Sequence, residues 1–269
     1  MILCLCAAFL QGCQRKGTSF VRLDLKGGEN QTVSLYEISA AQGSLFLDSI
    51  RLDSRGHGRI PFPDDSARLY ALTVPGNDGF LFLAPLPGEE IGIQAAYGSM
   101  VSTARLQSRL HSKAGTQTGR PSPSQDLLSY LRTTEDGLKA QAAIEETWNS
   151  NHHLASNRDS LYRSCTMQAD SLIASLKQKA EEYCSRNTDN LVPIFVFNKL
   201  FGSRPVFDPF QKEDWDFMHS KALEMQKAMP GNPHVRRLLF NLERIESARK
   251  NAILQEEKGK RNNETLDTR

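Results

Sequence analysis

Cysteine is scarce in this chain, and no two cysteines have the spacing of a redox motif. Only five of the 269 residues are cysteines. Cys4, Cys6 and Cys13 stand at the start of the chain, and Cys165 and Cys184 stand 19 residues apart. The absence of a Cys-x-x-Cys pair excludes a thioredoxin-type redox centre.

Long apolar runs and an excess of charge of one sign are also missing. No run reaches the about 20 apolar residues of a membrane-spanning helix. The 33 Lys and Arg residues nearly balance the 31 Asp and Glu residues, which argues against a nucleic-acid partner, because such partners favour a clustered basic face. The chain has neither a Gly-x-Ser-x-Gly elbow nor a Walker loop. These absences favour a non-enzymatic role, with no catalytic, cofactor-binding or metal-ligating residue assigned.

The start of the chain has the layout of an export signal. Residues 2–10 are apolar and lead into Leu10-Gln11-Gly12-Cys13, after which the sequence turns polar. The length suits the roughly 7–15 residues of a signal core. The pattern resembles a bacterial lipoprotein signal, which implies that Cys13 is lipidated and becomes the mature N-terminus. We therefore expect residues 1–16 to be a signal and lipid-anchor tether, and the protein to face the periplasm from a membrane. The alternative is an ordinary hydrophobic N-terminus with a chance cysteine.

The next part of the chain is patterned for strands. Apolar and polar residues alternate in residues 21–26, the period of a half-buried strand. Further short runs follow at 33–38, 45–52, 59–62, 69–74, 80–84 and 91–95. Clusters of glycine and proline lie between or beside these runs, as in all-β domains. We expect an antiparallel β-sandwich over residues 17–100.

One of the turn clusters contains two glycines and is flanked by arginines. The segment Arg55-Gly56-His57-Gly58-Arg59 superficially resembles a phosphate loop. Phosphate loops present the N-terminus of a following helix, and no helix pattern follows here. A hairpin turn is therefore the favoured interpretation.

The second half of the chain is patterned for helices. A Gly, Ser, Thr and Pro-rich stretch marks a linker at 101–122, and Ser122-Pro123-Ser124-Gln125 then forms a predicted capping box. A helical domain is expected over 123–253, followed by a disordered charged tail at 254–269. The fold class is thus α+β, an N-terminal antiparallel β-sandwich followed by an α-helical domain.

The helical domain contains several predicted helices. A long helix over 157–189 would carry Cys165 in its apolar stripe and place Cys184 about 28 Å away, which excludes a disulfide between them. The apolar segment 191–201 is a predicted buried helix, Asp208-Pro209 starts another, and Asn232-Pro233 caps the last.

The remaining candidates for chemistry favour structural interpretations. Adjacent His152 and His153 do not share a helix face and lack Cys, Asp or Glu partners at ligand spacing, so a solvated loop is preferred over a metal site. The carboxylate pairs Asp64-Asp65 and Glu89-Glu90 would point to opposite sides of a strand.

Part of the sequence resembles a known family. The resembling stretches are residues 35–38, 48–53, 58–62, 69–70, 87–91 and 210–235. They are similar to the N-terminal domain of unknown function, and the helical middle segment, of Gram-negative lipoproteins related to the TlpA thiol-disulfide oxidoreductases. The resemblance covers roughly residues 17–250. In that family the redox motif lies in a C-terminal thioredoxin-like domain, so the resemblance implies the scaffold and not the oxidoreductase activity.

Two classes of function follow from this sequence. The first is a membrane-anchored envelope lipoprotein that acts as a non-catalytic binding or scaffold module, with the membrane and an unidentified protein or ligand as partners. The alternative is the non-redox half of a thiol-disulfide oxidoreductase whose thioredoxin domain is missing or on a separate chain. No nucleic acid or cofactor is expected in either case.

Overall fold

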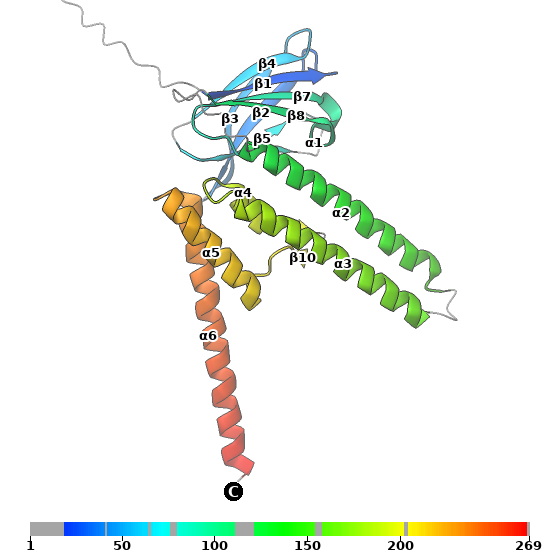
Figure 1. The fold of residues 1–269 in the computed structure, drawn as a ribbon, viewed down its shortest axis with the longest axis vertical. Helices are drawn as coiled ribbons and strands as arrows, with labels where there is room; N and C mark the ends of the chain where they lie inside the picture. Colours follow the sequence, from blue (N-terminus) through cyan, green and yellow to red (C-terminus); the bar gives the residue numbers. More distant parts are fainter. Residues whose placement is uncertain are drawn as a thin grey trace, which may run out of the picture.

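The computed structural model describes residues 19–40, 42–63, 66–75, 80–110, 121–153, 158–201 and 204–267. Its architecture is α+β, as expected: two four-stranded sheets come first in the chain and a helical region follows (Figure 1). The signal segment with Cys13 and the pair Asp64-Asp65 lie outside the described residues. Within the described ranges, no helix is both long and apolar enough to cross a membrane.

Each of the two sheets is built from strands that are not all consecutive in the chain. Sheet A has the order β4-β1-β7-β8 and sheet B the order β3-β2-β5-β6. The strands of sheet A are β1 (Ser19–Lys26), β4 (His57–Phe62), β7 (Glu89–Ala96) and β8 (Arg105–Leu110), and those of sheet B are β2 (Thr32–Ser39), β3 (Gly43–Arg51), β5 (Leu69–Thr73) and β6 (Leu81–Leu83). Neighbouring strands are antiparallel except β1 and β7, which run parallel.

Alternation along the strands builds the core between the sheets. In β1, Val21, Leu23 and Leu25 are at most 3% exposed, whereas Arg22 and Lys26 face solvent. The inward residues of both sheets pack into one hydrophobic cluster. This is the period of two that the sequence showed, and it leaves the outer face of sheet A polar.

The helical region packs below the sandwich and extends away from it. In Figure 1 the paired helices α2 and α3 project in one direction and α6 in another. The bounds are η1 (Tyr97–Ser99), α1 (Met100–Thr103), α2 (Pro123–Asn151), α3 (Arg158–Ser185), α4 (Val192–Phe197), α5 (Lys212–Ala228) and α6 (Pro233–Asp267), with a two-residue pair of strands, β9 (Leu200–Phe201) and β10 (Arg204–Pro205), after α4.

Sandwich and helices share a core. Leu69 and Ala84, at the edge of the sandwich, belong to the same buried cluster as apolar residues of α2 through α6. A hydrogen bond of 3.0 Å from the Ala84 amide to Ser124 Oγ connects the residue after β6 of sheet B to α2. Another, from Asn232 Nδ2 to the Ala67 carbonyl, 3.1 Å, joins the start of α6 to the loop before β5.

Local signals placed two helix starts correctly. The predicted capping box at α2 is present, because the Gln125 amide donates to Ser122 Oγ and the Ser122 amide donates to Gln125 Oε1. At α6, the His234 amide donates to Asn232 Oδ1 at 3.0 Å, as an N-cap asparagine does.

Three boundary predictions are wrong. The linker expected at 101–122 begins too early, because residues 105–110 form β8 against the edge of β7. The tail expected to be disordered from residue 254 continues α6 to Asp267; the segment contains no proline and many good helix formers. The helix predicted at Asp208 starts at Lys212, because Asp208 Oδ1 instead accepts from the Phe210 amide in a preceding turn.

Two further predictions need adjustment. The apolar segment 191–201 is helical only over Val192–Phe197, after which the chain enters β9. The turn at Gly56 is not a hairpin within one sheet: it carries the chain from β3 in sheet B to β4 in sheet A. Gly56 there has φ +79°, and a Cβ would lie 2.3 Å from the Leu25 carbonyl oxygen, so only glycine fits this corner.

Candidate functional site

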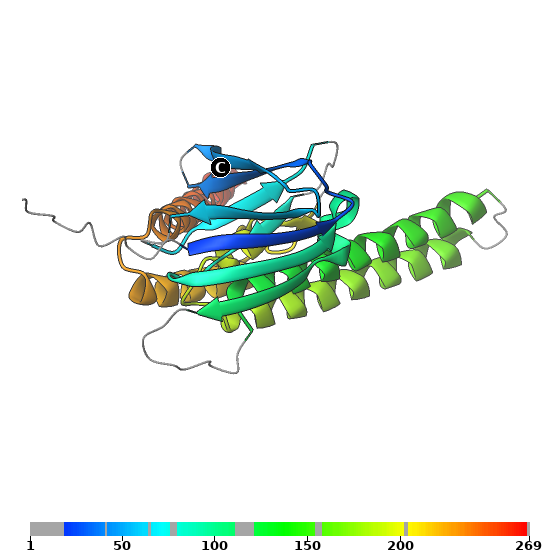
Figure 2. The same cartoon turned by 90° about the horizontal axis from the view of Figure 1, so that it is seen from above.

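The outer face of sheet A contains a polar depression of about 640 Å³. Side chains from all four strands, β4, β1, β7 and β8, line it. Strands β1, β7 and β8 lie in view in Figure 2 with no helix in front of them. The volume falls in the range of roughly 300–1,000 Å³ typical of small-molecule sites.

The strand register sets the residues that meet there. Arg59 on β4 is directly opposite Arg22 on β1, which pairs with Gly92 on β7, which in turn pairs with Gln107 on β8. Directly opposite residues project from the same face of a sheet. Gly92, which has no side chain, therefore forms the floor of the depression between longer neighbours.

Three arginines form one end of the depression. Arg22 Nη2 lies 2.6 Å from Glu90 Oε1, in an ion pair whose acidic side chain is 9% exposed. The guanidinium carbon of Arg59 lies 3.3 Å from the ring centroid of Phe20. Neither Arg59 nor Arg109 pairs with a carboxylate within the part of the chain that the structure describes. Two of the three cationic groups thus remain available.

The other end of the depression is acidic but internally satisfied. His57 lies between two carboxylates, with Nε2 3.6 Å from Asp24 Oδ1 and Nδ1 3.8 Å from Asp53 Oδ2. Gln94 Nε2 also donates to Asp24 Oδ2 at 3.2 Å. The His57 and Arg55 amides both donate to Asp53 Oδ1, and these bonds lower the pKa of the Asp53 carboxyl.

This chemistry suits binding better than catalysis. Both ring nitrogens of His57 face carboxylates, so neither is directed at a nucleophile. The lining residues include no Ser, Thr, Cys, Tyr or Lys that could act as one. What the depression offers is a pair of free guanidinium groups beside amides, which are donors for oxyanions.

Two other hollows have less specific chemistry. A groove of about 770 Å³ runs along the projecting α2–α3 pair and is lined by small or apolar side chains such as Ala143, Ile144 and Leu172, with no charged group. A smaller hollow of about 230 Å³ lies between sheet B and α6. Its His234 is buried, and burial lowers the pKa of that imidazole.

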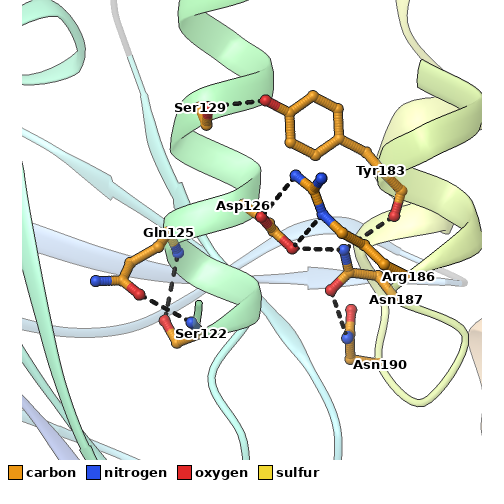
Figure 3. Close-up of polar contacts among 8 residues, drawn as sticks. All are labelled: Ser122, Gln125, Asp126, Ser129, Tyr183, Arg186, Asn187 and Asn190. Atoms are coloured by element: carbon orange, nitrogen blue, oxygen red, sulfur yellow. Dashed lines mark hydrogen bonds and ion pairs between the residues drawn. The ribbon is translucent and has the colours of Figure 1, made fainter. Parts of the chain in front are cut away.

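A buried polar cluster at the base of α2 is a structural joint. Figure 3 shows Arg186 approaching Asp126 with two nitrogens, Nε at 3.0 Å and Nη2 at 2.8 Å from the two carboxylate oxygens. Asn187 Nδ2 also donates to Asp126 at 2.8 Å and in turn Asn187 Oδ1 accepts from Asn190. Asp126 is 3% exposed. Because its oxygens are occupied from within the protein, this carboxylate ties α2 to the end of α3 and is not open to a ligand.

The carboxylate pair Glu89-Glu90 and the histidine pair His152-His153 lie on different elements and form no common site. Glu89 and Glu90 do point to opposite sides of β7, Glu89 toward Ser108 and Glu90 toward Arg22. His152 and His153 close the far end of α2, with 3.0 Å between their facing nitrogens. Within the described residues, no group of three or more His, Cys, Asp or Glu side chains has metal-binding geometry.

The cysteines of the helical region are buried and unpaired. Cys165 and Cys184 are both free thiols, in agreement with the exclusion of a disulfide along one helix. Cys184 is fully buried, and burial raises the pKa of its thiol. A protonated buried thiol is a poor partner for disulfide exchange.

Sequence reasoning did not find the depression. Its three arginines come from β1, β4 and β8, and β8 was assigned to a linker. Alternation in residues 21–26 indicated that Arg22 faces outward, and the sequence Arg105-Leu106-Gln107-Ser108-Arg109 carries the same period. Strand order and register, which bring these side chains together, have no local signal.

Comparison with known proteins adds no identity: no family model, no curated protein and no solved structure matches the chain.

Proposed function

We propose that this protein is a lipid-anchored protein of the cell envelope, facing the periplasm, whose β-sandwich acts as a non-catalytic binding module. The observation that carries the proposal is the depression on sheet A, to which four strands contribute polar side chains around a glycine floor. It combines free guanidinium donors with a lining that contains no Ser, Thr, Cys, Tyr or Lys to act as a nucleophile. The helices then serve as a scaffold that supports the sandwich from its other side.

The anchor rests on Cys13 and the apolar run before it. A single acyl chain binds a membrane only marginally, and proteins with the lipoprotein signal that this segment resembles carry several chains on one cysteine. An anchor at residue 13 would leave only five residues before β1 begins at Ser19. The sandwich, and with it the depression, would then be held close to the membrane surface.

The alternative is the non-redox half of a thiol-disulfide oxidoreductase whose thioredoxin domain is missing or on a separate chain. Only the sequence resemblance supports it. Both thiols of the helical region are buried, and nothing at the depression favours a redox partner over another ligand. We therefore keep the binding module as the proposed function.

Anchoring is tested by fractionating cells that express the wild type or Cys13→Ser. We expect the wild type in the membrane fraction and Cys13→Ser released from it, with incorporation of labelled palmitate only in the wild type. Equal labelling of the two proteins would contradict the anchor.

Binding is tested with the full chain purified in detergent. The protein is dialysed against the low-molecular-weight fraction of an envelope extract, and retained compounds are identified by mass spectrometry. The control is Gly92→Trp, which fills the depression without touching the sandwich core. We expect compounds that the wild type retains and Gly92→Trp does not. If the two proteins retain the same compounds, or none, the binding module at sheet A is wrong.

A further inference from the structure

Two arginines on sheet A lie where their like charges destabilise the pairing of β1 and β4. Arg22 and Arg59 are directly opposite each other on neighbouring strands, and like charges at such positions are destabilising. Arg22 is compensated by Glu90, whereas Arg59 has no carboxylate partner among the described residues. A local conflict of this kind, in a sheet that is otherwise regular, is expected where a surface binds something.

One of the two free guanidinium groups, that of Arg59, is held in place. Arg59 lies over the Phe20 ring at 3.3 Å, and a cation–π contact of this kind orients the planar group while its N–H edges stay exposed. Such an edge matches the two oxygens of a carboxylate or phosphate, which it can bind through two parallel hydrogen bonds. An arginine that is already oriented loses less side-chain freedom when it binds.

Glu90 divides the cationic end into two subsites. In the strand register, Glu90 on β7 lies between Phe20 on β1 and Arg109 on β8. Arg59 covers Phe20 on one side of this carboxylate, and Arg109 lies on the other. Glu90 neutralises Arg22 in the middle, so anionic groups are accommodated at the two unpaired arginines on either side of this ion pair. The strands carrying Phe20 and Arg109 are two spacings, or about 10 Å, apart.

We infer that the depression binds a small molecule with two separated oxyanion groups, carboxylate or phosphate, one at Arg59 and one at Arg109. Gln107 lies beside the Arg109 subsite, two residues away on the same strand, and as a lining residue it offers an amide to a polar group of the ligand. The volume of about 640 Å³ lies in the range of small-molecule sites. This inference rests on the proposed function, because it names the ligand class of the same depression.

The test is isothermal titration of the full chain in detergent with defined probes. Adipate and fructose 1,6-bisphosphate supply two carboxylates or two phosphates, propionate and inorganic phosphate supply one, and glucose supplies none. We expect at least one of the two-anion probes to bind roughly tenfold or more tightly than the matching one-anion probe, since each additional charged hydrogen bond contributes about that factor. Which of the two binds distinguishes a carboxylate from a phosphate ligand.

Variants then locate the binding. Arg59→Gln and Arg109→Gln should each weaken the two-anion probe by roughly tenfold to a hundredfold, and the double variant should reduce it to the level of the one-anion probe. Arg163→Gln is the matched control, because Arg163 is exposed on α3, far from sheet A, and it should bind as the wild type does. The three substituted side chains are exposed, so the thermal unfolding curves of all four variants should coincide with that of the wild type and show that each variant is folded.

The inference is overturned if no two-anion probe binds more tightly than its one-anion counterpart, or if Arg59→Gln and Arg109→Gln bind as Arg163→Gln does. A compound that the wild type retains from the envelope extract, that Gly92→Trp does not retain, and that carries no oxyanion would overturn this inference while leaving the binding module in place. If no compound depends on Gly92 and no probe binds, both proposals fail together.

Discussion

At the scale of single residues, Asp126 and Glu89 show how differently two buried carboxylates can be held. Asp126 accepts from a guanidinium and an amide, which compensates its removal from water. Glu89 is fully buried and accepts from the Leu86 amide and the Ser108 hydroxyl, both neutral. The first carboxylate joins two helices; for the second, burial raises the pKa and favours the neutral form.

Replacing Asp126 should destabilise the protein more than replacing an exposed acid on the same helix. We expect Asp126→Ala to lower the free energy of unfolding by about 2–4 kcal/mol, because Arg186 and Asn187 lose a charged acceptor. Asp136→Ala is the control: Asp136 is 78% exposed and only 3.6 Å from Lys139, so about 0.5 kcal/mol or less is expected. Urea unfolding measures both. Equal losses would mean that the Asp126 cluster does not stabilise the joint.

Glu89 should make the protein less stable as the pH rises. Burial raises the pKa of Glu89 above its usual 4.5, so between that value and the raised pKa the folded protein holds a proton that the unfolded chain has lost. Stability from this group is therefore full below about 4.5 and declines with increasing pH, by about 1.4 kcal/mol for each unit of the shift. Glu89→Gln should remove this decline. Unfolding curves from pH 4 to 8 that stay parallel for the two proteins would contradict the assignment.

At the scale of elements, α2 and α6 each have one buried end and continue well beyond their last buried residue. In α2 the buried residues end at Gly137, although the helix continues to Asn151. In α6 the apolar residues Val235, Leu239 and Leu242 are buried, whereas Asn251, Ala252 and Gln255 are exposed. The packed part of each helix thus lies near the sandwich, and the rest is supported by helix propensity and, in α2, by its pairing with α3.

Removing the end of α6 should therefore cost little stability. A chain that ends at residue 254 should unfold within about 2 °C of the full chain, because isolated helical extensions are only marginally stable in water. Its ellipticity at 222 nm per molecule should fall, since residues up to Asp267 are helical in the full chain. Differential scanning calorimetry and circular dichroism measure the two quantities. A large drop in the melting temperature would show that this segment packs against the rest of the protein.

At the scale of the whole molecule, the sandwich and the helices are joined by more than the chain between them. Leu69 and Ala84 share a buried cluster with the helices. Two hydrogen bonds cross the boundary, one from the Ala84 amide to Ser124 and one from Asn232 to the Ala67 carbonyl. Of these, Asn232 contacts Ala67, a residue 165 positions earlier in the chain. Contacts between segments so distant in sequence make the stability of each part depend on the other.

We therefore expect a single cooperative unfolding transition. The fluorescence of Trp215, whose indole donates to the Leu242 carbonyl between α5 and α6, reports on the helices, and hydrogen exchange of the amides in β1 and β2 reports on the sandwich. Both should give the same free energy of unfolding and the same midpoint in urea. Separate midpoints would show two independent domains, as the linker pattern in the sequence by itself would have indicated.

Local patterns determined much of the element list. Alternation in residues 21–26 located β1, because a half-buried strand exposes every second side chain. Short runs between turn clusters located the strands from β2 to β7. The capping box at Ser122 and the cap at Asn232 marked helix starts, because orphan amides at a helix N-terminus need local acceptors. The segment that became β8 was missed: Ser108 occupies its central inward position, so its apolar signal is weak and it forms a strand only against the edge of β7.

The sequence by itself indicated a signal-like apolar run at the start, short strands after it and helices in the second half. Alternation in residues 21–26 also indicated that Arg22 faces outward, whereas Arg59 stood only in a turn cluster and a short run. Only the tertiary structure decided that these two arginines lie side by side, that Arg109 joins them across β7, and that Gly92 leaves a hollow between them. The reason is that burial and capping act between near neighbours in sequence, whereas strand order and register are set by how both sheets close around a common core.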